Sequence, residues 1–393
     1  MIFLFLLIAT ELLAPAVLRQ HFYQRSKALF YILVIAHVIL SFWFWILFIT
    51  VTGNKGPFDS PGHIWSITQL AGMITGVIVP RIILILLHFT GKLLRYKAGG
   101  HIHWLTNTGL IVALSIFVVI ATGTLRGRFN FKTDYTEIRI KDLHPDLDGL
   151  KIVQLSDLHL ATFHHHRNLL AEQMKTVNSL EPDILFNTGD FVTFGWREFG
   201  NFDTILSKAE GKLGNFAVLG NHDFGTYHPY FTEADSRNNV LRINQLAESS
   251  GYKVLNDEHY VLPVKGAKIG IIGITTMGRH PDIVHGDLDK AIMDLDSVDL
   301  QILLSHDPNQ WELAVAGKTD IDITLSGHTH GMQMGIYTKK FKWSPSKYFY
   351  PHWGGLFSKG DQYHYVNRGL GVLAIPFRIW MPPEISVITL KKE

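Results

Sequence analysis

Four apolar runs in the first third of the chain constrain its fold more than any other feature. Each is close to the roughly 20 residues that a helix needs to cross the hydrocarbon layer of a bilayer. A buried helix of a soluble domain would seldom reach that length four times. The sequence therefore predicts a four-helix transmembrane module over residues 1–130, with spans at about 2–18, 28–51, 66–89 and 105–124.

The first span has two interpretations, a cleaved signal peptide or a retained helix. A signal peptide carries basic residues before its apolar stretch, whereas Arg19, the first basic residue here, follows that stretch. We therefore expect a retained helix. Glu11 and Arg81 lie at matching depths in the first and third spans, where an unpaired charge costs on the order of 3 kcal/mol. We predict that they form an ion pair; the alternative is that Arg81 reaches the interface and Glu11 is protonated or faces it.

The charges of this 393-residue chain divide near residue 130. Residues 1–130 contain ten Lys or Arg and two acids, a net charge of +8, and the remainder contains 26 basic and 32 acidic residues, a net charge of −6. A negative C-terminal part argues against nucleic-acid binding. The absence of cysteine excludes disulfide scaffolds, thiolate metal sites and a cysteine nucleophile.

Loop charges predict the orientation of the spans. The first and third loops together hold six Lys or Arg, against four in the second loop and the segment after the last span. Because basic loops stay cytoplasmic, we expect a multi-pass protein of a bacterial inner or plasma membrane, with the C-terminal domain outside the cytoplasm.

From about Lys132 onward, short β-branched runs alternate with amphipathic stretches, which predicts a layered α/β domain. Helical spacing occurs at 167–180 and 238–251. Buried strands are predicted at 151–156, 183–188, 215–220, 268–275, 299–305 and 322–327.

Five of these strands end in residues that can ligate a metal. Taken singly, each group could be a turn or a helix cap, but loops at the carboxyl ends of strands in an open α/β sheet converge on one crevice. Nitrogen and oxygen donors without thiolate suit zinc, manganese or iron, and their number suits two ions sharing a carboxylate. The groups are Asp157 with His159, Gly189 with Asp190, Asn221 with His222 and Asp223, His306 with Asp307, and His328 with His330.

The ordered motifs DxH, GD, GNHD, SHDP and GHTH resemble the calcineurin-like metallophosphoesterase superfamily over about residues 135–390. The resemblance implies a four-layer α-β-β-α domain over 131–393. It also implies that a hydroxide bridging two divalent ions attacks the phosphorus. The segments 367–371 and 382–385 further resemble the membrane-associated branch that acts on lipid-linked phosphate substrates.

By the same resemblance, Asp190 bridges the two ions and His222 stabilises the phosphoryl charge and protonates the leaving oxygen. Many family members have an aspartate where this chain has Thr193. Either Asp223 therefore orients His222, or His222 is less strongly polarised. The implied metal ligands are Asp157, His159, Asp190 and His330 for the first ion, and Asp190, Asn221, His306 and His328 for the second.

Residues 337–365 hold ten aromatic residues and five lysines. This composition suits the lipid headgroup layer, so the segment is either a cap that contacts the membrane or an ordinary packed excursion. His164, His165 and His166 are adjacent in sequence, and we leave them out of the site because neighbours seldom point at one centre.

These observations favour a membrane-anchored, dinuclear metal-dependent phosphoesterase acting on lipid-linked substrates. One alternative is a pyrophosphatase of the UDP-2,3-diacylglucosamine type in lipid A synthesis, although nucleotide sugars are cytoplasmic and the expected orientation is opposite. A second is a general extracytoplasmic phosphatase or phosphodiesterase. A third, from another class, is a membrane sensor that contains metal but does not catalyse; the complete ligand set argues against it.

Overall fold

The computed structural model describes residues 2–95, 102–276, 286–295, 297–338 and 340–393. Lys97 and Lys339, which the residue counts above include, lie outside these ranges. The chain divides into two compact units. The helical unit comprises Met1–Lys55, Ser66–Arg126 and Ala374–Ile379, and the α/β unit comprises Gly56–Trp65, Gly127–Leu373 and Trp380–Glu393.

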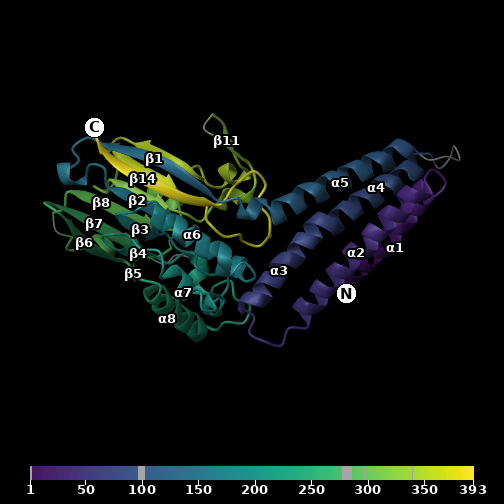
Figure 1. The fold of residues 1–393 in the computed structure, drawn as a ribbon, viewed down its shortest axis with the longest axis horizontal. Helices are drawn as coiled ribbons and strands as arrows, with labels where there is room; N and C mark the ends of the chain where they lie inside the picture. Colours follow the sequence, from purple (N-terminus) through teal and green to yellow (C-terminus); the bar gives the residue numbers. More distant parts are fainter. Residues whose placement is uncertain (1, 96–101, 277–285, 296, 339) are drawn as a thin grey trace. The chain divides into compact units, whose positions relative to one another are not determined.

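The four predicted spans are all helical (Figure 1). Each helix extends beyond its apolar run because backbone hydrogen bonding continues into the flanks. All four are long and apolar enough to cross a membrane, which supports a membrane protein. The third is continuous but contains a π-turn, η1, just before Pro80, which has no N–H to donate. The elements are α1 (Ile2–Phe22), α2 (Lys27–Thr52), α3 (Pro61–Met73), η1 (Ile74–Ile78), α4 (Val79–Leu94) and α5 (His103–Leu125).

The predicted ion pair between Glu11 and Arg81 is confirmed. Arg81 Nη1 lies 2.7 Å from Glu11 Oε1, and the two side chains are 9% and 14% exposed. Arg81 Nη2 donates to Ser41 Oγ at 3.0 Å and to His37 O at 3.1 Å, and Ser41 Oγ donates to the second oxygen of Glu11. Both charges are therefore compensated inside the helical unit.

The α/β unit contains two six-stranded sheets, and the strands predicted from the sequence are all present within one to three residues of their expected bounds. The first sheet has the order β1-β14-β2-β3-β4-β5, with β1 (Lys132–Ile140), β14 (Glu384–Lys392), β2 (Lys151–Leu155), β3 (Ile184–Asn187), β4 (Asn215–Ala217) and β5 (Tyr252–Val254). The second has the order β12-β13-β9-β8-β7-β6, with β12 (Gly355–Lys359), β13 (Gln362–Val366), β9 (Ile323–Ser326), β8 (Leu300–Ser305), β7 (Ala267–Ile274) and β6 (Glu258–Val264).

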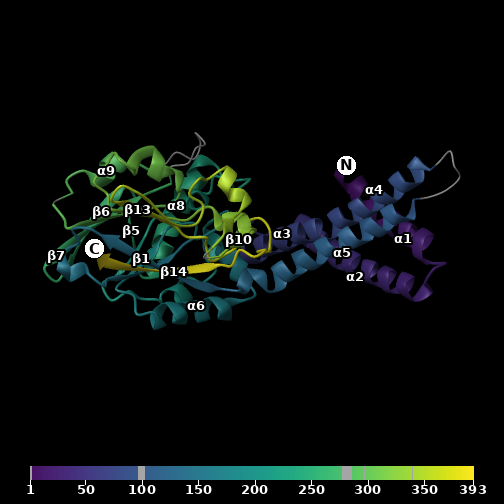
Figure 2. The same cartoon turned by 90° about the horizontal axis from the view of Figure 1, so that it is seen from above.

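Apolar side chains divide the α/β unit into layers. Ile152 and Ile184 of the first sheet and Ile271 and Ile302 of the second belong to one buried cluster between the sheets. A second cluster joins the first sheet to α6 (Arg167–Ser179), α7 (Asp203–Leu206) and α8 (Glu233–Ser249), and a third joins the other sheet to α9 (Leu288–Ile292). Figure 2 shows α6 and α9 on opposite sides of the sheets. The expected α-β-β-α order is confirmed.

Two details differ from the predicted elements. Helix α8 begins at Glu233 and not near residue 238, because Thr232 and Asp235 form a capping box. The aromatic segment is also not a single cap. Its last part forms β12 and β13, with Tyr365 buried, while β10 (Ile336–Tyr337) and β11 (Lys342–Trp343) form a separate hairpin.

Candidate metal centre

The predicted ligands lie just beyond the carboxyl ends of parallel strands. β2, β3 and β4 are parallel neighbours in the first sheet, and β8 and β9 are parallel neighbours in the second. Their ends therefore deliver side chains from both sheets to one place, as expected for such topologies. Six of the seven predicted ligands meet there in two groups joined by Asp190, and the seventh, Asn221, contacts the second group.

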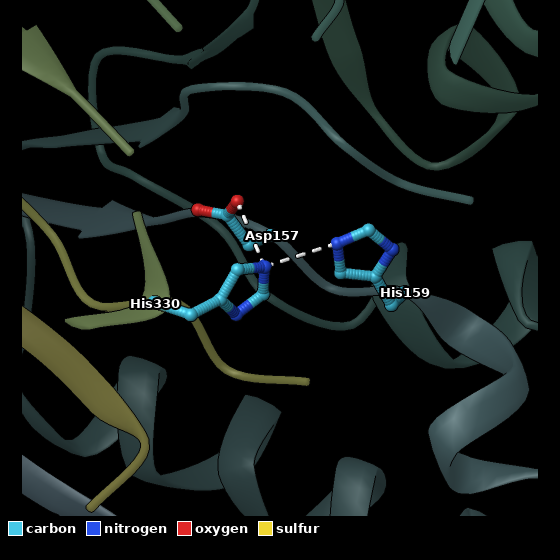
Figure 3. Close-up of side chains that lie close together, drawn as sticks. All are labelled: Asp157, His159 and His330. Atoms are coloured by element: carbon cyan, nitrogen blue, oxygen red, sulfur yellow. Dashed lines mark hydrogen bonds and ion pairs between the residues drawn. The ribbon is translucent and has the colours of Figure 1, made fainter. Parts of the chain in front are cut away.

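The first group consists of Asp157, His159 and His330 (Figure 3). His330 Nε2 lies 3.3 Å from Asp157 Oδ1 and 3.1 Å from His159 Nε2. All three side chains are at most 3% exposed. One carboxylate and two imidazole nitrogens thus face a common point, which is the donor chemistry of a divalent cation such as zinc, manganese or iron.

The second group consists of Asp190, His306 and His328, with Asn221 beside them. His306 Nε2 lies 3.1 Å from Asp190 Oδ2 and 3.2 Å from His328 Nδ1, and Asn221 Oδ1 lies 2.8 Å from His328 Nδ1. Asp190 Oδ2 is also 3.7 Å from His159 Nε2. Asp190 therefore touches both groups, which is the position of a shared carboxylate.

Backbone conformation aims several of these side chains. Asp157, His159, Asp190, His328 and His330 all have positive φ, between 40° and 73°. This left-handed region costs a residue other than glycine about 1–3 kcal/mol and is concentrated at functional sites. Two motif glycines permit the close approach: a Cβ on Gly220 would lie 2.2 Å from Asp190 Oδ1, and one on Gly327 would lie 2.4 Å from Asp157 Oδ2.

The electrostatics of the second group favour positive charge. Burial alone would lower the pKa of His306, but the carboxylates of Asp190 and Asp157 raise it to about 10. Conversely, burial would raise the pKa of Asp190, but His306 and His222 hold it well below its ordinary value. His306 Nδ1 donates to Thr188 O at 2.7 Å, so Nε2 faces the carboxylate. The field that retains a proton on this nitrogen also favours a divalent cation.

His222 lies beside both groups but is held by a backbone carbonyl. Its Nδ1 donates to Thr193 O at 2.7 Å, and its ring stacks on Tyr227 with centroids 4.3 Å apart. The Thr193 hydroxyl lies 3.1 Å from Nδ1 of the ligand His159. Burial lowers the pKa of His222 despite the nearby Asp190 carboxylate. Thr193 therefore orients both imidazoles, one through its main chain and one through its side chain.

The structure changes the role expected for Asp223. Its carboxylate accepts hydrogen bonds from the backbone N–H groups of Asp190, Val192 and Gly220, at 2.8–3.2 Å. Burial and the adjacent Asp190 carboxylate raise the pKa of Asp223 to about 8. Asp223 thus contacts the loop that carries Asp190, and the group next to His222 Nδ1 is Thr193 O. Of the two expected alternatives, this geometry favours a less strongly polarised His222 over orientation by Asp223.

Two tyrosines near the ligands were not identified as site residues from the sequence. Tyr350 Oη lies 2.8 Å from Nε2 of His328, and Asn221 Nδ2 donates to Tyr227 Oη at 3.0 Å. The high density of aromatic residues in 337–365 could have identified Tyr350 as a candidate site residue. Tyr227 follows the GNHD motif without any distinctive pattern, so its position could only come from the fold.

A cavity of about 580 Å³ lies elsewhere in the α/β unit. None of the seven predicted ligands lines it. Its buried cation, Arg368, is bonded to Glu384 and lies 3.1 Å from Asp134 Oδ2. The candidate metal centre is therefore the two ligand groups and not this cavity.

Comparisons with known proteins point to the same place. The family model described as calcineurin-like phosphoesterase matches residues 150–332. The chain is 30% identical over 259 residues to the uncharacterized metallophosphoesterase YkuE of Bacillus subtilis, covering 62% of this chain and 80% of that protein. It is 30% identical over 292 residues to the transmembrane protein with metallophosphoesterase domain of Danio rerio, covering 72% of this chain and 62% of that protein. It is 29% identical over 279 residues to the UDP-2,3-diacylglucosamine pyrophosphatase LpxG of Chlamydia muridarum, covering 62% of this chain and 84% of that protein.

Proposed function

Because this chain belongs to the calcineurin-like phosphoesterase family, we propose that it is a membrane-anchored, dinuclear metal-dependent hydrolase of lipid-linked phosphate esters or pyrophosphates. The phosphoesterase chemistry follows from the family. The two groups of ligands joined by Asp190, all buried except the partly exposed His328, are the observation that carries the dinuclear assignment. The apolar helices support the anchoring, and exposed aromatic residues beside Tyr350 support the lipid substrate.

The proposed chemistry divides between bound cations and protein groups. Two divalent cations, held by the seven ligands, would neutralise phosphate oxygens and activate water. His222 in its imidazolium form would give its Nε2 proton to the leaving oxygen, because Thr193 O holds the Nδ1–H and leaves the Nε2–H for the substrate; the charge of a bound phosphate would favour this form. The carboxylates of Asp157 and Asp190 would ligate the cations, so neither is assigned to proton transfer.

The lipid substrate is supported by three consecutive aromatic residues. Tyr348 and Phe349 are 70% and 57% exposed, whereas the next residue, Tyr350, contacts the ligand His328. Phe341 is also exposed, and Lys342 and Lys347 lie in the same stretch. Exposed aromatics mixed with lysines suit the headgroup layer. A lipid-linked phosphate held by this surface would have its reacting group beside the metal ligands.

A nucleotide-linked diacylglucosamine is the second candidate substrate, favoured by the similarity to the chlamydial pyrophosphatase. The expected orientation distinguishes the two candidates. A domain outside the cytoplasm would not meet a nucleotide sugar, so cytoplasmic placement of residue 393 in a reporter fusion would favour this second substrate.

The test is hydrolysis by the purified full chain in nanodiscs, loaded in turn with manganese, zinc and iron. The substrates are p-nitrophenyl phosphate, its bis-ester, and a phosphatidyl and a UDP-linked lipid. We expect hydrolysis of the bis-ester and of at least one lipid. Metal binding without hydrolysis of any of the four would contradict the proposal and favour the sensor.

A matched pair of variants tests the lipid surface. Tyr348→Ser with Phe349→Ser should slow hydrolysis of the lipid and leave that of the soluble bis-ester unchanged. Tyr135→Ser, at a residue that is 68% exposed on β1, is the control. If the double variant hydrolysed both the lipid and the bis-ester at the wild-type rates, this segment would have no role in contacting the lipid.

A further inference from the structure

The loop that joins the second and third apolar helices contains a fully buried acid. Residues 56–65 belong to the compact α/β unit, although the residues on either side belong to the helical unit. Asp59 in this loop is 0% exposed. A buried carboxylate must be compensated by a cation or by hydrogen bonds.

Asp59 is bonded to the loop that follows the GD motif. Arg197 Nη1 lies 3.2 and 3.3 Å from its two carboxylate oxygens, and the Arg197 N–H also donates to Oδ2 at 3.4 Å. A Cβ on Gly195 would lie only 2.4 Å from Asp59 Oδ2. The carboxylate therefore fits against the backbone of residues 195–197, where a larger neighbour could not be accommodated.

Other residues of segment 56–65, which comprises the end of the loop and the first residues of α3, contact the segments that follow the first three motifs. The Phe58 ring packs edge-on against Phe194 and His228, with centroids 5.2 Å apart in each pair. The Trp65 ring contacts His165 at 4.6 Å. Segment 56–65 is thus seated on three segments, each of which begins a few residues beyond a group of predicted metal ligands.

A short chain of hydrogen bonds continues from the Asp59 contact to the proposed active site. Glu198, next to Arg197 in the chain, accepts from the N–H groups of Thr193 and Phe194 at 3.0 and 2.6 Å. Thr193 O in turn accepts from His222 Nδ1, and the Thr193 hydroxyl contacts His159 Nδ1. Displacement of residues 195–198 would therefore move the group that orients His222.

We propose that Asp59 is a positioning residue, and that the loop between the second and third apolar helices sets the orientation of His222 through Arg197, Glu198 and Thr193. The inference rests on the proposed function, since it assigns His222 to proton transfer. It goes beyond that function because it makes the inter-helix loop part of the machinery for turnover.

The test uses the full chain in nanodiscs with Asp59→Ala, Arg197→Ala and the double variant. Hydrolysis of bis-p-nitrophenyl phosphate is measured together with metal content and hydrogen exchange of residues 192–200. Arg197 is 41% exposed, so Arg197→Ala is a second route to the same contact should Asp59→Ala fail to fold. Asp142→Ala, at an exposed position after β1, is the matched control.

We expect a fall in kcat of about 10-fold in each single variant, the lower end of what losing an outer partner of a site costs. KM and metal content should change little, amide exchange in residues 192–200 should accelerate, and the double variant should be no slower than the worse single variant. Asp59→Asn, which keeps an oxygen acceptor, should restore part of the loss.

Three results would overturn the inference: kcat equal to wild type in both single variants, multiplicative losses in the double variant, or loss of kcat only in proportion to loss of folded protein. Failure of the proposed function would look different. The wild type would then be inactive with metal bound, while exchange in residues 192–200 would still report whether Asp59 holds the loop.

Discussion

Buried carboxylates in the helical unit and in the α/β unit are neutralised in different ways. In the helical unit, the partly buried Glu11 is paired with the guanidinium of Arg81, which carries its charge at every physiological pH, and Glu11 Oε2 also lies 3.4 Å from His37 Nε2. At the candidate metal centre, the carboxylates of Asp157 and Asp190 face imidazoles, whose charge depends on pH. The first arrangement is closed by the protein itself, whereas the second would be completed by a divalent cation.

A third arrangement lies between these two. Glu198 and Asp223 are buried in the α/β unit and accept hydrogen bonds from backbone N–H groups. Burial raises the pKa of Glu198 to about 7 and that of Asp223 to about 8, so protonation removes the charge of these acids, which hold loops in place without a cation or an arginine. Burial of an acid therefore does not by itself indicate its role. The role is indicated by the chemical type of the group that the acid contacts.

Replacing the shared carboxylate should have the largest effect. Asp190→Asn removes the charge that both ligand groups use, so we expect both metals to be lost. Activity should fall by more than the roughly 100-fold loss that is typical of removing only an outer partner. Metal analysis of the purified protein and bis-p-nitrophenyl phosphate hydrolysis measure this. Full retention of two metals would show that Asp190 is not shared.

Replacing His222 should separate turnover from metal binding. Because proton transfer typically contributes about 10²–10⁴-fold, His222→Ala should lower kcat by that order while metal content stays the same. The same two measurements apply. A parallel loss of metal and activity would assign His222 to ligation and remove it from proton transfer.

Breaking the closed pair should affect stability alone. Glu11→Gln leaves the Arg81 charge without its carboxylate, at a cost of about 3 kcal/mol to the helical unit. Unfolding of the chain in mixed micelles should show this loss, with metal content unchanged. In the double variant with Arg81→Gln the two effects should not add. Additive losses would show that the 2.7 Å contact contributes no coupling.

The smallest effect concerns the dependence of stability on pH. Burial raises the pKa of Glu198 from 4.5 to about 7, against hydrogen bonds from Phe194 and Thr193 that lower it. Between pH 4.5 and 7 the native state thus holds a proton that the unfolded chain releases. The stabilisation from this group is complete below pH 4.5 and is lost as the pH rises to about 7.

Glu198→Gln should therefore flatten this fall in the free energy of unfolding, measured by urea titration at several pH values. Glu137→Gln, at an exposed position on β1, is the control. If the free energy of unfolding fell with pH as steeply in the Glu198 variant as in the wild type, Glu198 would already be ionised in the native state below pH 7.

Much of the fold was predictable because it depends on local pattern. Long apolar runs become helices wherever they occur, and β-branched runs such as 268–275 become buried strands. The predicted ligands were recognisable because each follows such a strand, and the sheet order brings the strand ends together. β1 and β14 were not predicted, since β14 pairs with β1 more than 240 residues away in sequence and no local pattern reports such a partner.

The supporting contacts of the site could not be predicted for a different reason. Thr193 was recognised as a departure, but its main-chain carbonyl orients His222, and any residue offers a carbonyl. Asp59 carried no motif, and only its burial against residues 195–197 identifies its partner.

The amino-acid sequence by itself determined the apolar spans, the division of charge near residue 130 and the types of ligand that follow the strands, because these depend on composition and on spacing along the chain. Only the tertiary structure decided which groups contact and orient the site residues and their loops. Thr193 contacts His222, Tyr350 contacts His328, and Asp59 contacts the loop at 195–198. Such partners are set by distance and direction in space, which residues far apart in sequence acquire only when the chain folds.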